Sequence, residues 1–167
     1  PKSQWKSDQI SRFDTSNRIL NGKINIKTPK TEKIKSAKKS IIYHASQSMP
    51  HTSSGYAIRT HGLISALNNH GMKVETILRF GYPLDRNDFK GNNISSIEKI
   101  ENVTYHFSHT DRDDKSLINY QEVYNFNQIE EYQNKAISSI ISQAKKIRPK
   151  LIHSASNFVV GMAGAKA

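Results

Sequence analysis

The sequence predicts an α/β protein in which strands and helices alternate along the chain. The first observation behind this prediction is an apolar run at residues 41–43, a loop of small polar residues, a helical pattern over 55–70 and a β-branched run at 72–79. The second is an apolar stripe of about five helical turns over 128–147, followed by a strand-like run at 150–154. Such alternation favours a Rossmann-like parallel sheet with helices on both faces.

The first strand is expected to end near Ser46, because the Gln, Ser, Pro, Thr and Gly residues that follow cannot continue it. A helix then begins near Gly55 and stops at Gly71, and the strand after it would lie parallel to the first in a right-handed βαβ unit. The apolar residues of this helix recur at intervals of three and four, so we expect them on one buried face. They are Ala57, Ile58, Leu63, Ile64, Ala66 and Leu67.

The segment between the second strand and the long helix mixes loops with short strands. Residues 80–88 form a polar and aromatic loop that is too long for a simple connection. Alternation at 94–97 and at 103–107 predicts two short strands separated by a turn at 101–102. The acidic, polar stretch 110–115 is expected to be a surface loop.

The long helix is the clearest element of the pattern. Its stripe consists of Ile129, Tyr132, Ala136, Ile137, Ile140, Ile141, Ala144 and Ile147. Arg148 and Pro149 are expected to end it, and the strand at 150–154 follows. Asn157 is a candidate N-cap for a final helix that the end of the sequence truncates, so we expect the chain to be part of a longer protein.

The formal charge of +11 is concentrated near the N-terminus. Residues 1–39 hold 11 Lys and Arg against 3 acids, whereas residues 40–167 carry the predicted domain and a net charge of only +3. We expect 1–39 to be a basic, largely irregular extension, with a helix over 7–20 and a brief edge strand over 23–27. Such an arm could contact nucleic acid, an anionic membrane or an acidic polymer, or it could be a solvated linker.

Composition excludes several classes of site. The sequence has no cysteine, which rules out disulfides and thiolate chemistry and fits a reducing cytoplasm. The longest weakly apolar run, 158–165, is too short to span a bilayer, and the N-terminus lacks the apolar core of a signal peptide. The histidines show neither HxxxH nor HExxH spacing, so we expect no metal, and nothing in the sequence calls for a cofactor.

In a doubly wound sheet, ligands bind at the carboxyl ends of the strands, here after Ser46, Arg79, Phe107 and Ser154. The loop of Ser53, Ser54 and Gly55 precedes a helix N-terminus, whose N–H groups and positive dipole favour an anion or a sugar. The loop matches neither the Walker pattern nor GxGxxG, so an ordinary turn is the alternative.

Several side chains lie where they could reach such a ligand. Arg59 is a candidate clamp for a phosphate or carboxylate, the alternative being a surface arginine. His61 is read as a packed histidine rather than a proton donor, and His153 follows a strand in a ligand-facing position. Asp85, like the pair at 113–114, is either a carboxylate ligand or a solvated loop acid.

Three segments together carry a family resemblance. Residues 53–63 read SSGYAIRTHGL, 79–85 read RFGYPLD and 149–158 read PKLIHSASNF. In this order, and over roughly residues 40–167, the sequence resembles the N-terminal domain of bacterial family-four glycosyltransferases, which are retaining enzymes built from two Rossmann-like domains in the GT-B architecture. Residues 1–39 take no part in the resemblance. The usual loop carries two glycines, and Ser54 departs from that pattern.

The resemblance implies that this domain holds a glycan or lipid-linked acceptor, while a second domain binds most of the nucleotide-diphosphate sugar. It places Ser54 and Gly55 near the donor diphosphate and implies work at the inner membrane face in surface polysaccharide synthesis. The candidates for substrate binding are Tyr56, Arg59, His61, Tyr82, Asp85, His153 and Asn157. The alternative is a non-catalytic module whose basic arm docks nucleic acid or anionic lipid, although the aromatic and basic interleaving of single-strand binders is absent.

Overall fold

The computed structural model describes residues 2–30, 33–119, 128–156 and 158–167. Within these ranges the chain forms a single five-stranded sheet with the strand order β3-β4-β2-β1-β5. The strands are β1 (Ser40–Ala45), β2 (Lys73–Leu78), β3 (Ile97–Ile100), β4 (Val103–His106) and β5 (Leu151–Ser154).

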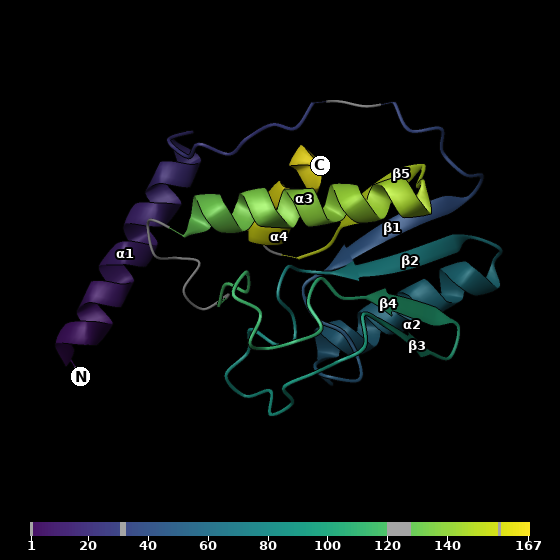
Figure 1. Ribbon diagram of the computed structural model, residues 1–167, viewed down its shortest axis with the longest axis horizontal. Helices are drawn as coiled ribbons and strands as arrows, with labels where there is room; N and C mark the ends of the chain where they lie inside the picture. Colours follow the sequence, from purple (N-terminus) through teal and green to yellow (C-terminus); the bar gives the residue numbers. More distant parts are fainter. Residues whose placement is uncertain (1, 31–32, 120–127, 157) are drawn as a thin grey trace.

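The sheet is parallel except at one edge. β1 pairs in parallel with β2 and β5, β2 pairs in parallel with β4, and only β3 runs antiparallel, against β4. The carboxyl ends of β1, β2, β4 and β5 therefore meet along one side of the sheet, called here the carboxyl edge (Figure 1). This topology confirms the predicted Rossmann-like α/β fold.

The helices cover both faces of the sheet (Figure 1). They are α1 (Lys2–Leu20), α2 (Gly55–Asn69), α3 (Ile129–Ile147) and α4 (Phe158–Lys166). α2 packs on β2 and β4, whereas α3 packs on β1 and β2, and α4 on β5 and β1. The predicted helices at 55–70 and 128–147 are confirmed, as are the flanking strands.

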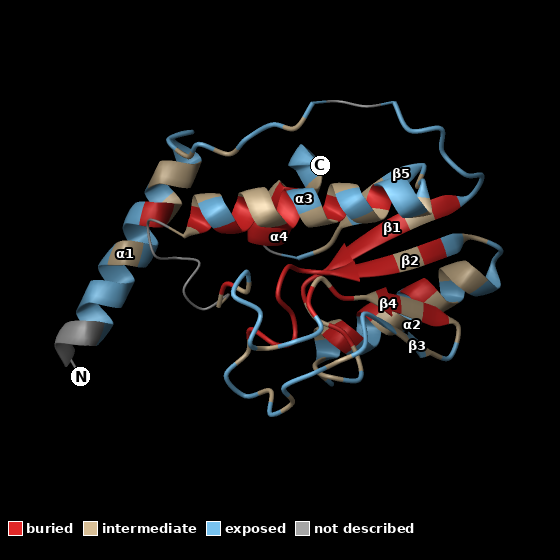
Figure 2. Ribbon diagram, in the orientation of Figure 1, coloured by how far each residue is buried: buried red, intermediate tan, exposed pale blue. Residues whose placement is uncertain are grey.

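The core consists of two apolar clusters, one on each face of the sheet. Ile42 and Ile77 belong to the cluster under α3 and α4, whereas Tyr43 and Leu78 belong to the cluster under α2. Neighbouring residues of one strand thus enter opposite clusters, as the period of two requires. Figure 2 shows the buried strands β1 and β2 at the centre of the molecule.

The buried face of α2 is narrower than its sequence suggested. Ala57, Thr60 and Ile64 are buried, whereas Ile58 and Leu63 are 55% and 47% exposed. Positions 57, 60 and 64 form one row at intervals of three and four, and Ile58 and Leu63 lie roughly 100° to either side of it. The expectation that every apolar residue of this helix faces the sheet was wrong, because the apolar residues occupy more than one row.

The short strand expected at 94–97 lies further along the chain, as β3 at Ile97–Ile100. β3 and β4 form a hairpin in which Ile100 pairs with Val103, so only 101–102 remain for the turn. Glu101 takes a left-handed φ of 53° there. The tight turn fixes the register, and this places the strand immediately before it.

The N-terminal extension is more ordered than expected. α1 spans nineteen residues rather than the predicted 7–20, and residues 23–27 do not form a strand. Instead the N–H groups of Asn25 and Lys27 donate to Glu130 Oε1 and Asn134 Oδ1 of α3, both at 2.9 Å. Polar and apolar residues do alternate in this segment, but it lies along α3 instead of pairing with a strand. Ile24 and Ile26 pack against the cluster under α3.

Two expectations concern α4 and the possible membrane spans. Asn157, the expected cap of α4, lies outside the described residues. Among the helices that the structure describes, none is both long and apolar enough to cross a bilayer.

α4 approaches β5 closely enough to require a glycine. A Cβ at Gly164 would overlap the Ser154 hydroxyl and lie 2.9 Å from Ser154 Cβ. The same hydroxyl lies 3.3 Å from Nδ1 of His44, which is 2% exposed on β1. Burial lowers the pKa of His44 to about 4, so this imidazole is neutral at pH 7.

Gly164→Ala is expected to destabilise the fold by about 1–3 kcal/mol, because the overlap with Ser154 outweighs the helix propensity gained by removing a glycine. Gly161→Ala is the matched control, since no atom lies within 4 Å of its added Cβ. The control should be neutral or stabilising by up to about 1 kcal/mol. Urea unfolding measures both, and equal stabilities would show that α4 packs less closely.

His44 should make the fold sensitive to mild acid. Its folded pKa of about 4 lies below the ordinary histidine value of 6.5, so the unfolded chain binds the proton first and stability falls as the pH drops below 6.5. The expected loss between pH 7 and pH 5 is about 2 kcal/mol. His44→Gln should remove that loss in urea titrations, whereas the exposed control His70→Gln should keep it. An unchanged loss in His44→Gln would contradict the assignment.

Candidate functional site

The loops at the carboxyl edge are tied directly to the end of β1. The N–H of Arg79 donates to the Ala45 carbonyl at 2.8 Å, and the N–H of Ala155 donates to the His44 carbonyl at 2.9 Å. The loops that follow β1, β2 and β5 therefore leave the sheet side by side. This arrangement is the convergence on one edge that the strand pattern predicted.

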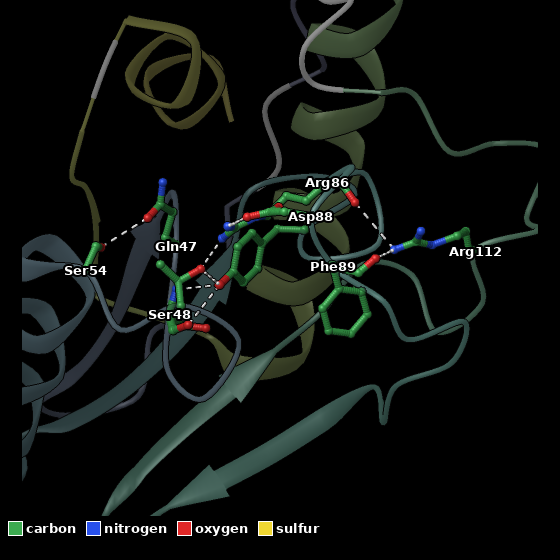
Figure 3. A network of polar contacts seen from close by, with 9 residues as sticks. Gln47, Ser48, Ser54, Arg86, Asp88, Phe89 and Arg112 are labelled. Carbon is green, nitrogen blue, oxygen red and sulfur yellow. Dashed lines mark hydrogen bonds and ion pairs between the residues drawn. The ribbon is translucent and has the colours of Figure 1, made fainter.

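The Tyr82 hydroxyl joins the loop after β2 to the loop after β1. It donates to the Ser48 carbonyl at 2.8 Å and accepts from the Ser48 N–H at 3.3 Å. Thr52 Oγ1 lies 2.8 Å from the same oxygen. Because Tyr82 is fully buried, these contacts are shielded from water. Figure 3 shows Ser48 with dashed lines to its partners in this network.

The loop after β2 carries its own ion pairs. Arg79 pairs with Asp85, and both are 4% exposed. Arg86 Nε donates to Asp88 Oδ1 at 2.8 Å, and its guanidinium also contacts Thr52 in the loop after β1. Figure 3 shows Arg86 beside Asp88, and Arg112 beside the carbonyls of Arg86 and Phe89.

These contacts change the interpretation of two sequence candidates. Tyr82 and Asp85 were expected to face a substrate, and Asp85 otherwise to be a solvated acid, but both side chains are buried. Their partners are loop residues, so they position the loop walls. Gly81 supports this turn with a φ of 87°, and a Cβ there would lie 3.2 Å from Asp85 Cβ.

Ser54 and Gly55 form the start of α2. Ser54 Oγ accepts the Ala57 N–H at 3.3 Å, the contact of a helix N-cap, and donates to Gln47 Oε1 at 3.2 Å (Figure 3). The structure thus gives a reason for serine in place of glycine. Gly55 is exposed, its φ is not left-handed, and no atom of the described residues lies within 4 Å of an added Cβ. The turn does not need glycine there, but the approach to the first N–H groups of α2 is open.

Tyr56 and His153 lie beside this helix start. The Tyr56 hydroxyl accepts the Ser46 N–H at 3.2 Å and donates to the Ala155 carbonyl at 3.0 Å, which joins the ends of β1 and β5. Burial raises the pKa of Tyr56. His153 is exposed, and its ring lies 4.9 Å from that of Tyr43. Tyr56 therefore positions this corner, whereas His153 is accessible on it.

Arg59 and His61 separate in the structure. Arg59 is exposed one turn after Gly55 and has no salt bridge to any described carboxylate. His61 points elsewhere, with Nδ1 2.6 Å from the Tyr105 hydroxyl and Nε2 3.3 Å from Glu101. These contacts agree with the reading of His61 as a packed, hydrogen-bonded histidine, and its position on α2 faces the β3–β4 hairpin instead of the loop.

A polar groove of about 1040 Å³ opens where the chain leaves β4. Ser108, His109, Asp114 and Ser116 form one wall, and the Ser-rich flank of α3 forms the other. The groove exists because α3 packs on β1 and β2 but not on β4. Its lining also carries cations and anions together, among them Lys135 and Glu131, whose charges pair at 2.7 Å.

A directed hydrogen-bond chain stabilises the first wall. The Gly81 N–H donates to Ser108 Oγ at 2.9 Å, and Ser116 Oγ donates to Asp114 Oδ1 at 2.7 Å. Because the Ser116 hydroxyl donates its only proton to Asp114, its oxygen can only accept from His109. His109 Nε2–H therefore donates to Ser116 Oγ at 3.0 Å. His109 Nδ1 then accepts from Ser108 Oγ at 2.8 Å, as a neutral imidazole whose pKa is lowered by burial.

Sequence reasoning nominated the loop after Phe107 but not Ser108 or His109 individually. The signal that could have found them is their position directly after β4 at the carboxyl edge. Among the described side chains, no group of three or more histidines or carboxylates could hold a metal ion. Hydroxyl, amide and imidazole groups line the groove together with three lysines and three carboxylates, and such polar groups can hydrogen-bond a polyhydroxylated ligand.

Tyr82→Phe should destabilise the domain by about 1–3 kcal/mol, since both backbone groups of buried Ser48 lose their partner. Tyr105→Phe is the matched control, because its buried ring is kept and only the contact to half-buried His61 is lost. We expect the smaller cost there, by thermal unfolding. A Tyr82→Phe variant as stable as the wild type would show that the two loops do not depend on this hydroxyl.

Comparison with known proteins adds no assignment to this geometry. No protein-family model matches the chain, and neither the curated proteins nor the solved structures gave a match. The function must therefore be inferred from the side chains at the carboxyl edge and from the motifs of the sequence.

Proposed function

We propose that residues 40–167 form the acceptor-binding half of a retaining glycosyltransferase of GT-B architecture. In this proposal a second Rossmann-like domain binds most of the nucleotide-diphosphate sugar, and the acceptor is a glycan or a lipid-linked glycan used in surface polysaccharide synthesis. The enzyme works in the cytoplasm, peripherally at the inner membrane face. The 167-residue chain by itself transfers no sugar, because the reaction takes place between the two domains.

The observation that carries the proposal is the presence of two complementary features on one sheet edge. The exposed start of α2 at Gly55 leaves room for a diphosphate against backbone N–H groups. The groove beside Ser108 and His109 offers hydroxyl and imidazole groups to an acceptor sugar. Both lie at the carboxyl edge, where ligands bind in open parallel sheets.

The chemistry asked of this domain is electrostatic. As the sugar leaves its nucleotide, negative charge grows on the diphosphate, and positioned N–H donors near Gly55 stabilise that charge without reorganising. Arg59 lies one helical turn further and adds a planar pair of donors. Ser54 is committed to the helix cap, so its hydroxyl supports the loop.

A non-catalytic binding module is the competing function, and the basic extension is the observation that favours it. The two proposals differ in what the carboxyl edge must do. A module that binds only through its extension has no use for an open helix start, so substitutions at Gly55 should leave its binding unchanged.

Gly55→Val tests the diphosphate placement in the enzyme that contains both domains. Its side chain fits the helix but fills the approach to the N–H groups, so turnover should fall by at least about tenfold, or roughly 1.4 kcal/mol. Gly62→Val is the matched control, since Gly62 is also exposed on α2 with no atom near an added Cβ. Release of nucleoside diphosphate from nucleotide sugars measures both variants.

Arg59→Ala should lower turnover in the same direction while the helix start stays intact. If Gly55→Val keeps full turnover, the diphosphate lies elsewhere on the edge. If no nucleotide sugar supports acceptor-dependent release in the wild-type enzyme, glycosyl transfer itself is excluded. Circular dichroism of each variant confirms that the comparison is made between folded proteins.

A further inference from the structure

The free side of α1 carries large apolar side chains. Trp5, Ile10, Phe13 and Leu20 are 66%, 67%, 77% and 85% exposed. They fall within one broad side of the helix, because their positions span about 140° at 100° per residue. Thr15, on the opposite side, is fully buried, and Ile19 packs against the cluster under α3. α1 thus turns its apolar side away from the domain.

Figure 1 shows α1 projecting from the body of the molecule beside the start of α3. The contact is anchored at the C-terminal end of α1, where Arg18 lies 3.4 Å from Glu130. Figure 2 shows that the projecting part is coloured as exposed over most of its length. Four large aromatic and aliphatic side chains on one exposed side of a helix are available for contact with an apolar phase.

Cations accompany this apolar side. Lys6 lies within this side of α1 and Arg12 at its border, both of them exposed, and residues 30–39 carry five more described lysines. They are Lys30, Lys33, Lys35, Lys38 and Lys39. At the amino-terminal ends of the strands, called here the amino edge, a hollow of about 560 Å³ is lined by Lys38, Lys39, Lys73 and Lys150, and none of its described lining residues is acidic.

We propose that the chain attaches to anionic lipid bilayers, with the apolar side of α1 inserted at the interface and the lysines of residues 30–39 held against the headgroups. Apolar insertion and cationic attraction are the two signals that stable peripheral attachment requires. Trp and Phe suit the interface, and long Lys side chains can keep their charge at the headgroups. This attachment does not depend on glycosyl transfer.

The charge selects this occupant over others. A second copy of the chain would bring the same net charge of +8 in residues 1–39 against itself, which opposes pairing at low salt. Nucleic acid would satisfy the lysines but leave Ile10, Phe13 and Leu20 exposed to water. Only an anionic surface with an apolar interior accepts both groups of side chains.

Trp5 is the single tryptophan of the sequence, so its fluorescence reports on α1 directly. We expect a blue shift when the 167-residue chain meets vesicles containing phosphatidylglycerol at low salt, and quenching when the lipids carry brominated acyl chains. Vesicles of phosphatidylcholine alone should give little change. Added salt should weaken binding, because the lysine contribution is screened.

Variants separate the two signals. Phe13→Ser combined with Leu20→Ser should lower vesicle partitioning at least tenfold, whereas Ile58→Ser, at an apolar position on α2 that is 55% exposed, should not change it. Lys38→Gln combined with Lys39→Gln should lower partitioning by up to about fivefold for each charge removed and should flatten the salt dependence.

Three results would overturn the proposal. Vesicle sedimentation without any change in Trp5 emission would show that α1 does not insert. Dimers in analytical ultracentrifugation that dissociate when Phe13 and Leu20 become Ser would assign the apolar side of α1 to a second copy. Equal partitioning onto neutral and anionic vesicles would remove the role of the lysines.

Discussion

The carboxyl edge depends on one contact, the buried Tyr82 hydroxyl bound to both backbone groups of Ser48. A loop lacks the regular backbone hydrogen bonds of a helix or sheet, so contacts with groups outside the loop must fix its position. Here the Arg79–Asp85 ion pair folds the loop after β2, and the folded loop presents Tyr82 to the loop after β1. That second loop leads into Ser54 and the exposed start of α2. The geometry proposed for a diphosphate therefore depends on contacts made by the loop after β2.

The groove at the end of β4 has a different origin. The sheet is wider than the helix layer above it, because α3 and α4 cover β1, β2 and β5 while the hairpin of β3 and β4 is covered on the α2 side. On the side left open, half-buried His106 bonds Glu75 at 2.8 Å, and this contact lowers the pKa of Glu75. Polar pairs of this kind let part of a sheet face water without an apolar penalty. The result is a concave, hydroxyl-rich surface beside the strand ends.

Charge and function are separated along the molecule. The groove at the carboxyl edge combines three lysines and three carboxylates with imidazole and hydroxyl groups, whereas the hollow at the amino edge is lined by four lysines. Such a distribution leaves the charges of the groove balanced, while the amino edge is positive. It also allows the extension to bind a surface while the carboxyl edge stays accessible.

The sequence alone determined the elements that rest on local periodicity. The spacing of apolar residues predicts α2 and α3, the parallel strands before and after them, and the convergence of loops on one edge. Only the tertiary structure decided which side chains on that edge are accessible. Tyr82 and Asp85 look like ligand residues in a linear pattern, but Ser48 and Arg79 engage them in the folded protein. His109 shows the converse, since its role depends on Ser116 and Gly81, which no local pattern connects to it. The spacing of apolar residues shows which side of its own helix or strand a residue occupies. Its hydrogen-bond partners depend on how separate elements pack against one another.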